Sequence, residues 1–215
     1  MGGGCKKTDW SVFYGIVELV PKVSEQARQT RRGDLLEAGW RCLRQTTFPQ
    51  LTVDQLCAAA GVSKGAFYGH FQSKQDFLLA LLEQDSADLD EAMERMEGSE
   101  TNAVRRLRGF ARTMLSRNRG RAQVRADLWS EMPSQAAVRA LLATKVAARR
   151  GRLRAWVEEG VRAGELTDTP ANALASLLLA IGDGLSLHAG LDPGAFRWEN
   201  ISHALDLLLA GLARE

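Results

Sequence analysis

The sequence is poor in cysteine, histidine and proline. Its 215 residues include three Cys, three His and five Pro. The cysteines are widely separated and have no metal-ligand spacing to the histidines, so neither a structural zinc site nor a disulfide framework is expected. Free thiols fit a reducing cytosol, and we predict a cytoplasmic protein. The scarcity of proline, with 45% hydrophobic and 25% charged residues, favours a mostly helical soluble chain.

Long hydrophobic runs are also missing. The apolar run near the N-terminus, Trp10 to Val20, is interrupted by Glu18 and has about half the length that spans a bilayer. It lacks the basic start and the small-residue cleavage site of a secretory signal. We therefore expect no membrane segment, and we interpret residues 1–27 as a poorly ordered N-terminal extension. In a competing interpretation, the aromatic side chains of this extension dock on the rest of the chain or on a partner.

Enzyme motifs are absent as well. No Gly-rich phosphate loop follows a predicted strand, and no Ser or Cys nucleophile has a nearby His partner. Carboxylate pairs such as Glu158 with Glu159 have the pattern of an exposed helix surface. We expect a binding protein and not an enzyme, with no cofactor and no metal.

What the chain does contain is a dense set of helix signals between Leu51 and Phe77, which reads LTVDQLCAAAGVSKGAFYGHFQSKQDF. Thr52 followed by Gln55 predicts a capping box for a helix that runs to about Ala60. Gly61 can adopt the left-handed conformation that ends a helix sharply. A second short helix follows a turn at this glycine.

Ser63 predicts the cap of that second helix, Lys64 to about Phe71. Ser73 with Asp76 predicts a further capping box for a long third helix. Another amphipathic helix is expected before the motif, at about 30–45. Two short helices that meet at a tight turn are typical of a helix-turn-helix.

Positive charge is concentrated on this motif. Residues 28–75 contain seven Lys or Arg against three Asp or Glu, although the whole chain has a formal net charge of only +2. Such an excess on one segment is the electrostatic pattern of a phosphate-binding surface. A charge balance of this size also arises by chance on protein surfaces.

The run AGVSKGAFYGHFQSKQDF, Ala60 to Phe77, resembles the DNA-binding half of the TetR family of bacterial one-component regulators. The resemblance implies that the second short helix enters the major groove, and that two copies bind a roughly palindromic double-stranded operator. It implies two groups of contacts, to phosphates and to bases. The phosphate group is Thr52, Tyr68, His70 and Lys74. The base-reading group is Lys64, Gly65 and Ala66, with Ser63 and Gly69 in the same site.

The chain departs from the family pattern at Gly69, where relatives usually have a larger side chain, so one potential base reader is missing. Structural alternatives also stay open. Tyr68 can be a packed surface aromatic, His70 a solvated or capping residue, and Lys74 an ordinary lysine at a helix start. The arginines of residues 149–154 are interpreted as the solvated face of a long helix and not as a second nucleic-acid site.

The remainder of the chain has helical periodicity to its end and no strand alternation of useful length. The predicted fold class is all-α, with about nine helices in a three-helix DNA-binding domain and a larger helical effector-binding and dimerisation domain. The expected domains are 1–27, 28–75 and 76–215. The first expected helix of the larger domain ends at about residue 96. Further helices are expected at about 102–117, 121–130, 133–164, 170–188 and 195–213.

The last two predicted helices are apolar on more than one side, so part of their surface must be buried elsewhere. Both sides can be used within one monomer core. The resemblance instead implies a homodimer with a four-helix interface, which Gly182 and Gly184 would allow to pack closely. The predicted interface residues are Leu174, Leu178, Ile181, Leu185, Ile201, Leu205, Leu208 and Leu212.

The resemblance also implies a small, mostly apolar effector, held between central helices, that favours the state unable to bind DNA. Asp183, on an apolar helix, either orients a polar ligand group or faces the dimer mate. The segment around 128–190 is similar to larger C-terminal domains that include choline-responsive regulators. The candidate pocket residues are Met93, Phe110, Met114, Trp129, Trp156 and His188.

Two functions follow from these observations. The first is a ligand-responsive transcriptional repressor that a small molecule releases from its operator. The alternative is a dimeric architectural DNA binder or activator without a small ligand, which acts through a protein partner.

Overall fold

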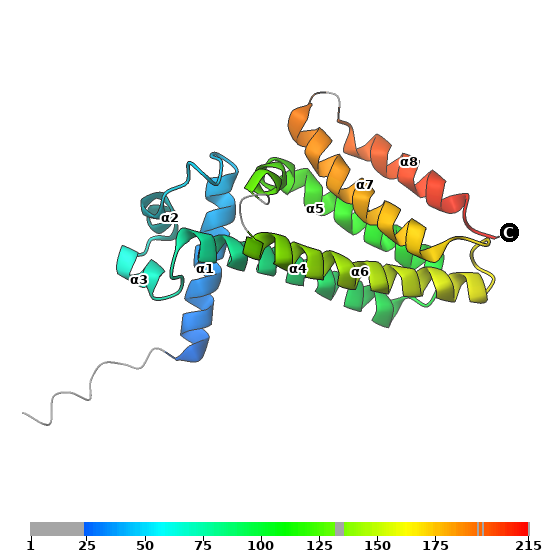
Figure 1. Cartoon of the computed structure of the whole chain (residues 1–215), viewed down its shortest axis with the longest axis horizontal. Helices are drawn as coiled ribbons and strands as arrows, with labels where there is room; N and C mark the ends of the chain where they lie inside the picture. The colour runs from blue at the N-terminus through cyan, green and yellow to red at the C-terminus, as the bar shows by residue number, and fades with distance from the viewer. Residues whose placement is uncertain (1–23, 132–135, 193, 195, 215) are drawn as a thin grey trace, which may run out of the picture.

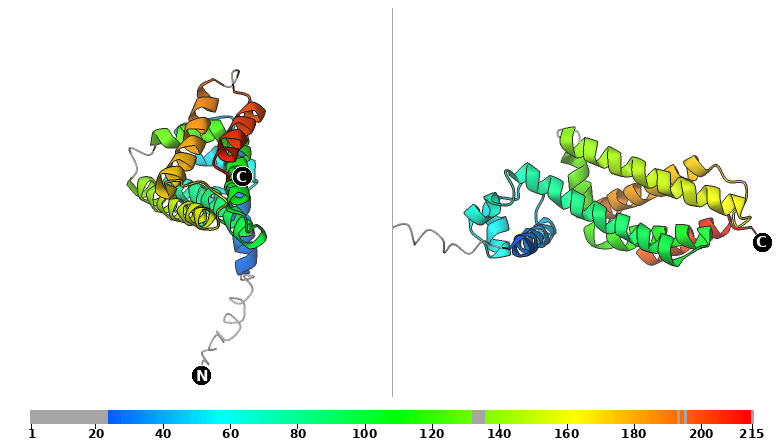
Figure 2. Two further views of the ribbon diagram at one scale, coloured as in Figure 1. Left: turned by 90° about the vertical axis from the view of Figure 1, so that its right-hand side faces the viewer. Right: turned by 90° about the horizontal axis from the view of Figure 1, so that it is seen from below.

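The structure is a computed structural model that describes residues 24–131, 136–192, 194 and 196–214, with side chains except at 118–131 and 190. The molecule is elongated (Figure 1). A small head made of α1, α2 and α3 lies at one end, and a helical body lies at the other. Helix α4 runs from the head into the body, and the C-terminus lies at the end far from the head (Figure 2).

The head contains the helix-turn-helix that the sequence predicts, formed by α1 (Glu25–Leu43), α2 (Val53–Ala60) and α3 (Lys64–Tyr68). The predicted capping box of α2 is present, and Gly61 ends this helix at φ 66°. Helix α1 begins before the expected start near residue 30, because Ser24 accepts a hydrogen bond from the Ala27 N–H and caps it. Helix α3 is shorter than predicted, since residues 69–70 form a turn.

The body is built from α4 (Lys74–Ser99), α5 (Ala103–Glu131), α6 (Ala136–Arg162), α7 (Ala171–Leu191) and α8 (Trp198–Ala210). The described residues thus form eight helices and not about nine, because the two helices expected at 102–117 and 121–130 are one continuous helix. Gly120 does not end α5: a lone glycine lowers helix propensity by only about 1 kcal/mol, which packing along a long helix can offset.

The long helix α4 has the predicted Ser73 cap, in an altered form. The Ser73 hydroxyl accepts from the Asp76 N–H at 3.0 Å. The Asp76 carboxylate accepts from the Gln72 N–H at 2.9 Å, and not from the N–H of Ser73 as in a standard capping box. Both bonds satisfy amides that the first turn of a helix leaves without partners.

Two hydrophobic cores lie along the molecule, one in the head and one in the body. The head core combines α1–α3 with the start of α4, and it includes Phe67, Phe71 and Phe77. Its members also include Val138, 1% exposed, from the first turn of α6. The body core is formed by α4–α8 around Phe110 and Trp156. Because α6 contributes to both cores, it links the head to the body in addition to α4.

Two arginines of the 149–154 segment differ from the predicted solvated face, whereas Arg154 is exposed as expected. Arg149 has a side chain only 11% exposed and donates to Asp90 at 2.9 Å and to the backbone oxygen of Ser86 at 2.9 Å. Arg152 forms an ion pair with Glu97 at 2.7 Å, which lowers the Glu97 pKa. These arginines turn inward because α4 presents carboxylates along the side that packs on α6.

Helix α7 is long and apolar enough, by length and composition, to cross a membrane. A single helix of this kind is weak support for a membrane span, because core helices of soluble proteins have the same composition. Here α7 packs against both α5 and α6. Its apolar composition therefore has a role within this fold.

Candidate nucleic-acid interface and ligand cavity

The short helix α3 is presented outward by the aromatic core beneath it. Phe67 is fully buried, and its ring contacts the ring of Tyr68 edge to face at 5.3 Å between centroids. Tyr68 is 53% exposed. The Ser63 hydroxyl accepts from the Ala66 N–H at 3.2 Å, so the side chain of Ser63 is used as the helix cap. The predicted base-reading side of α3 is exposed to solvent, as is Gly69 at its end.

Lys64, one of the predicted base readers, forms an ion pair in this structure. Its ammonium lies 2.7 Å from a carboxylate oxygen of Asp54 on α2, and both side chains are more than 60% exposed, at 62% and 66%. This pair raises the pKa of Lys64. Exposed ion pairs contribute little to stability, so a ligand of strong negative charge can compete for the lysine.

Three arginines of α1 surround the end of α3, and the sequence did not single them out individually. Arg28 donates to the carbonyl oxygen of Gly69 at 3.4 Å, and the Arg32 guanidinium lies 5.1 Å from the centre of the Phe71 ring. Burial, and then the charges of Arg28, Arg32 and Arg31, lower the pKa of His70. These surroundings disfavour the protonated form of His70 and favour an anion beside it. The excess of basic residues over 28–75 was the sequence signal for this cluster.

The two remaining predicted phosphate contacts lie at helix starts. Thr52 is exposed, and its N–H donates to the Gln55 side chain at 2.8 Å within the capping box. The Lys74 ammonium donates to the carbonyl oxygen of Pro49 at 3.0 Å and lies 4.5 Å from the centre of the Phe48 ring. Lys74 is half-buried. Its charge is thus held at a fixed place on the head surface.

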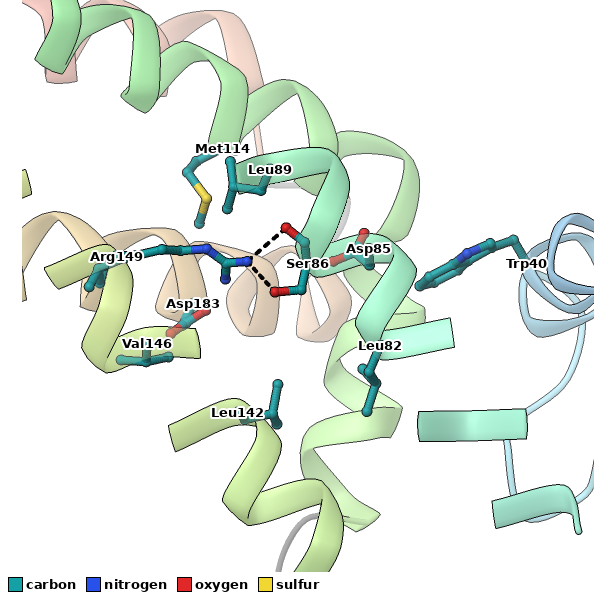
Figure 3. Close-up of a pocket in the computed structure, with 11 residues that line it drawn as sticks. Trp40, Leu82, Asp85, Ser86, Leu89, Met114, Leu142, Val146, Arg149 and Asp183 are labelled. Atoms are coloured by element: carbon teal, nitrogen blue, oxygen red, sulfur yellow. Dashed lines mark hydrogen bonds between the residues drawn. The ribbon is translucent and has the colours of Figure 1, made fainter. Parts of the chain in front are cut away.

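A cavity of about 90 Å³ lies where the head meets the body (Figure 3). Its wall is mostly apolar, with two aspartates, one serine and one arginine among the lining groups. Figure 3 shows the Arg149 guanidinium directed at Ser86, with Asp183 on the neighbouring side. The lining residues come from α1 and from α4 to α7, and they are Trp40, Leu82, Asp85, Ser86, Leu89, Met114, Leu142, Val146, Arg149, Leu179 and Asp183.

The predicted pocket residues fall in different places. Met114 lines the cavity, as does Asp183. Met93 and Phe110 are fully buried in the body core, and His188 is exposed. The side chain of Trp129 lies outside the described residues.

Trp156 is also a core residue and not a cavity residue. Its side chain is 3% exposed, and its ring N–H donates to Glu97 at 2.9 Å. The sequence marked large apolar residues of central helices, but it contained no signal that would separate a residue with packed neighbours from one beside a hollow. Within the described residues, no group of three or more Asp, Glu, His or Cys side chains gathers as a metal site.

The predicted dimer stripe faces mainly inward. Leu174, Leu178 and Leu205 are buried in the core of their own subunit, so they offer almost no surface to a partner. Leu208 is 66% exposed. The other predicted residues are half-buried and pack against the body core, namely Ile181, Leu185, Ile201 and Leu212.

A different set of leucines is exposed on α7 and α8. The exposed fractions are 55% at Leu177, 44% at Leu187, 74% at Leu191, 60% at Leu207 and 66% at Leu208. We call these five residues the outer leucine face. Sequence periodicity identified two apolar sides on each helix but could not assign one of them to the monomer core.

The two glycines of α7 have different surroundings. A Cβ atom at Gly182 would lie 2.5 Å from the Met114 side chain, whereas a Cβ atom at Gly184 would meet nothing within 4 Å in the described structure. Gly182 thus permits close packing within the subunit. Gly184 is half-buried, with open space at its Cβ position. It lies seven residues from both Leu177 and Leu191, so it shares their side of the helix.

Comparison with known proteins gives matches to both halves of the chain. Residues 35–81 match bacterial regulatory proteins of the tetR family, and residues 103–214 match the C-terminal domain of BetI-type transcriptional repressors. The transcriptional repressor AcnR of Corynebacterium efficiens is 30% identical over 196 residues, which are 85% of this chain and 93% of that protein.

Other similarities are narrower in length or in sequence. The repressor Rv1474c of Mycobacterium tuberculosis is 36% identical over 67 residues, 31% of this chain and 36% of that protein, so the match spans about a third of that relative's length. A TetR transcription regulator of Haloarcula marismortui has a TM-score of 0.77 at 20% identity, covering 86% of this chain and all of that one (100%). The chain belongs to the TetR family of bacterial transcriptional regulators.

Proposed function

We propose that the protein is a dimeric repressor that binds a palindromic DNA operator and is released from it by a small, mostly apolar ligand. The observation that carries the proposal is the position of the cavity. Trp40 belongs to the DNA-binding head and Asp183 to the last helix pair, and both line the same hollow. A ligand there contacts the head directly, so it can have different affinities for two head positions, as a population shift requires.

The DNA contacts follow from the surface of the head. Helix α3 presents Lys64, Gly65 and Ala66 to the major groove, while Tyr68 and His70 lie beside the arginines of α1. Thr52 and Lys74 flank this surface and contact the backbone on either side. Gly69 leaves the end of α3 without a side chain, so base reading is concentrated at the start of the helix.

The outer leucine face supports the dimer. Exposed leucines gathered on two adjacent helices are typical of an interface. Two subunits that pair through α7 and α8 form a four-helix interface around a two-fold axis, and such an axis matches a palindromic site. The cavity favours this proposal over the alternative of an architectural DNA binder without a ligand.

The test is binding to the intergenic DNA beside the protein's own gene. We expect fluorescence anisotropy to show saturable binding at one site, and members of a metabolite library that raise the melting temperature to release the DNA. Binding to many unrelated sites with indifference to every stabilising compound would support the architectural alternative. Absence of DNA binding at low salt would contradict both.

A further inference from the structure

We propose that the cavity between head and body selects a compact ligand with a carboxylate group and a short apolar body, and that Arg149 binds the carboxylate. The inference rests on the proposed function, because it names the class of molecule that the cavity accepts. Its two supporting observations are the geometry of the largely buried Arg149 guanidinium and the volume of the cavity beside it.

Two of the three nitrogens of Arg149 are engaged by the protein. Nε donates to Asp90 at 2.9 Å, and Nη2 donates to the backbone oxygen of Ser86 at 2.9 Å and to the Ser86 hydroxyl. Nη1 has no hydrogen-bond partner within the described part of the chain, and Arg149 itself lines the hollow. The contacts of Nε and Nη2 along one edge of the planar guanidinium therefore hold Nη1, on the other edge, toward the cavity.

The carboxylate that pairs with Arg149 is shared with a second cation. Asp90 accepts from Arg149 and also from Lys145 at 3.3 Å, so one carboxylate faces two cations. Asp85, on the cavity wall, lies 2.7 Å from Arg117, which balances its charge. A ligand carboxylate at Nη1 completes the pairing of Arg149 through a charge-assisted hydrogen bond, about twice as strong as a neutral one.

The rest of the hollow sets the size and the polarity of the ligand. Apart from its polar groups, the wall consists of aliphatic side chains, Met114 and Trp40. Because a water needs roughly 10–15 Å³ of such space, about 90 Å³ accepts about six to nine non-hydrogen atoms. Asp183 is a carboxylate of the same wall and already has a partner in the protein, so the ligand places its apolar body, and not its carboxylate, on that side.

The same wall disfavours a quaternary ammonium. Cages for such cations are built from several aromatic rings, and Trp40 is the one aromatic residue among the described residues that line this cavity. A cation would also lie beside the guanidinium of Arg149, while the two carboxylates of the wall, Asp85 and Asp183, already have partners in the protein. Selection of an acid over a cation of the same size is therefore the sharpest consequence of the geometry.

Calorimetric titration with three probes of nearly equal size tests the inference: 3-methylbutanoate, 3-methylbutanamide and choline. We expect the acid to bind at least about tenfold more tightly than the amide, and choline to bind more weakly than both. Equal affinities for acid and amide, or tighter binding of choline, would overturn the inference.

Two variants locate the binding. Arg149→Lys keeps a charge but loses the fork, so the preference for acid over amide should fall by about tenfold. Val146→Phe fills the hollow and should abolish binding of both molecules, whereas Ala147→Phe, on the exposed side of α6, should change neither. Undiminished binding to Val146→Phe would place the acid elsewhere and contradict the inference. If Arg149→Lys does not fold, two measurements still test the inference. They are the preference of the wild-type protein for acid over amide and the comparison of Val146→Phe with Ala147→Phe.

Operator binding, measured in parallel without any probe, separates this inference from the proposed function. A protein that binds its operator but prefers no carboxylate contradicts the ligand class alone. A protein that prefers the carboxylate but binds no DNA supports the ligand class and contradicts the repressor.

Discussion

The side chains that face DNA in the proposed complex already have partners within the head. Lys64 contacts Asp54, and Lys74 contacts the carbonyl oxygen of Pro49. Each contact limits the conformations of a long flexible side chain, so less entropy is lost when DNA binds. A DNA phosphate either replaces such an internal contact of the lysine or binds the lysine in addition to it. In both cases the ammonium group is already positioned before DNA binds.

The two lysines should differ in what their loss does. Lys74→Ala removes a phosphate contact, so we expect weaker binding to every sequence and a salt dependence shallower by about one unit in log–log slope. Lys64→Ala should in addition reduce the preference for operator over random DNA. Salt titrations on both DNAs measure this. An unchanged slope for Lys74→Ala would mean that this lysine contacts no phosphate.

His70 should make operator binding depend on pH. Burial and the arginines of α1 lower its pKa in the free protein, and a nearby phosphate would raise it, so binding takes up a proton. Affinity should therefore increase as the pH falls toward the free-state pKa from above, by at most about tenfold per pH unit. His70→Asn should flatten the profile between pH 8 and 6. A wild-type profile as flat as that of the variant would contradict the contact.

At the scale of elements, helix α1 is fixed to α4 by a close approach at one glycine. A Cβ atom at Gly39 would lie 2.5 Å from the ring of Phe77, while a Cβ atom at Gly33 on the same helix would meet nothing within 4 Å. The head orientation relative to α4 thus depends on the absence of a side chain at a single position.

Alanine at these two glycines should have opposite effects on stability. Gly39→Ala should lower the free energy of unfolding by about 1–3 kcal/mol, because overpacking at Phe77 exceeds the gain in helix propensity. Gly33→Ala should raise it by about 0.5–1 kcal/mol. Urea unfolding followed by circular dichroism compares them. Equal stabilisation by both would mean that α1 moves away from Phe77 at little cost.

Local signals predicted the elements of the head well, and tertiary packing decided what they missed. Thr52, Gly61 and Ser63 act within a few residues of themselves, so the boundaries of α2 and the turn followed from the sequence. The continuation of α5 through Gly120 depends on neighbouring helices, which periodicity does not report. The same limit applies to the site, since the inward direction of Arg149 is set by carboxylates on α4, many residues away.

For the whole molecule, the two cores share helix α6. Its first turn places Val138 in the head core, while Leu153 and Val157 lie in the body core. Leu142, between these ends, lines the cavity. A ligand that displaces α6 at Leu142 would therefore act on the head through the packed side chain of Val138, and α4 would not need to deform.

The assembly of two such molecules should depend on the outer leucine face. Replacing both Leu177 and Leu208 by Glu puts charges on a surface that we expect to be dry in the dimer, and burying an unpaired carboxylate is costly. We expect light scattering after size exclusion to give a monomer, and operator affinity to fall by at least about a hundredfold, because one head then binds one half-site. Ala147→Glu, on the exposed side of α6, is the matched control and should remain dimeric. A double variant that still elutes as a dimer would place the interface on another surface of the body.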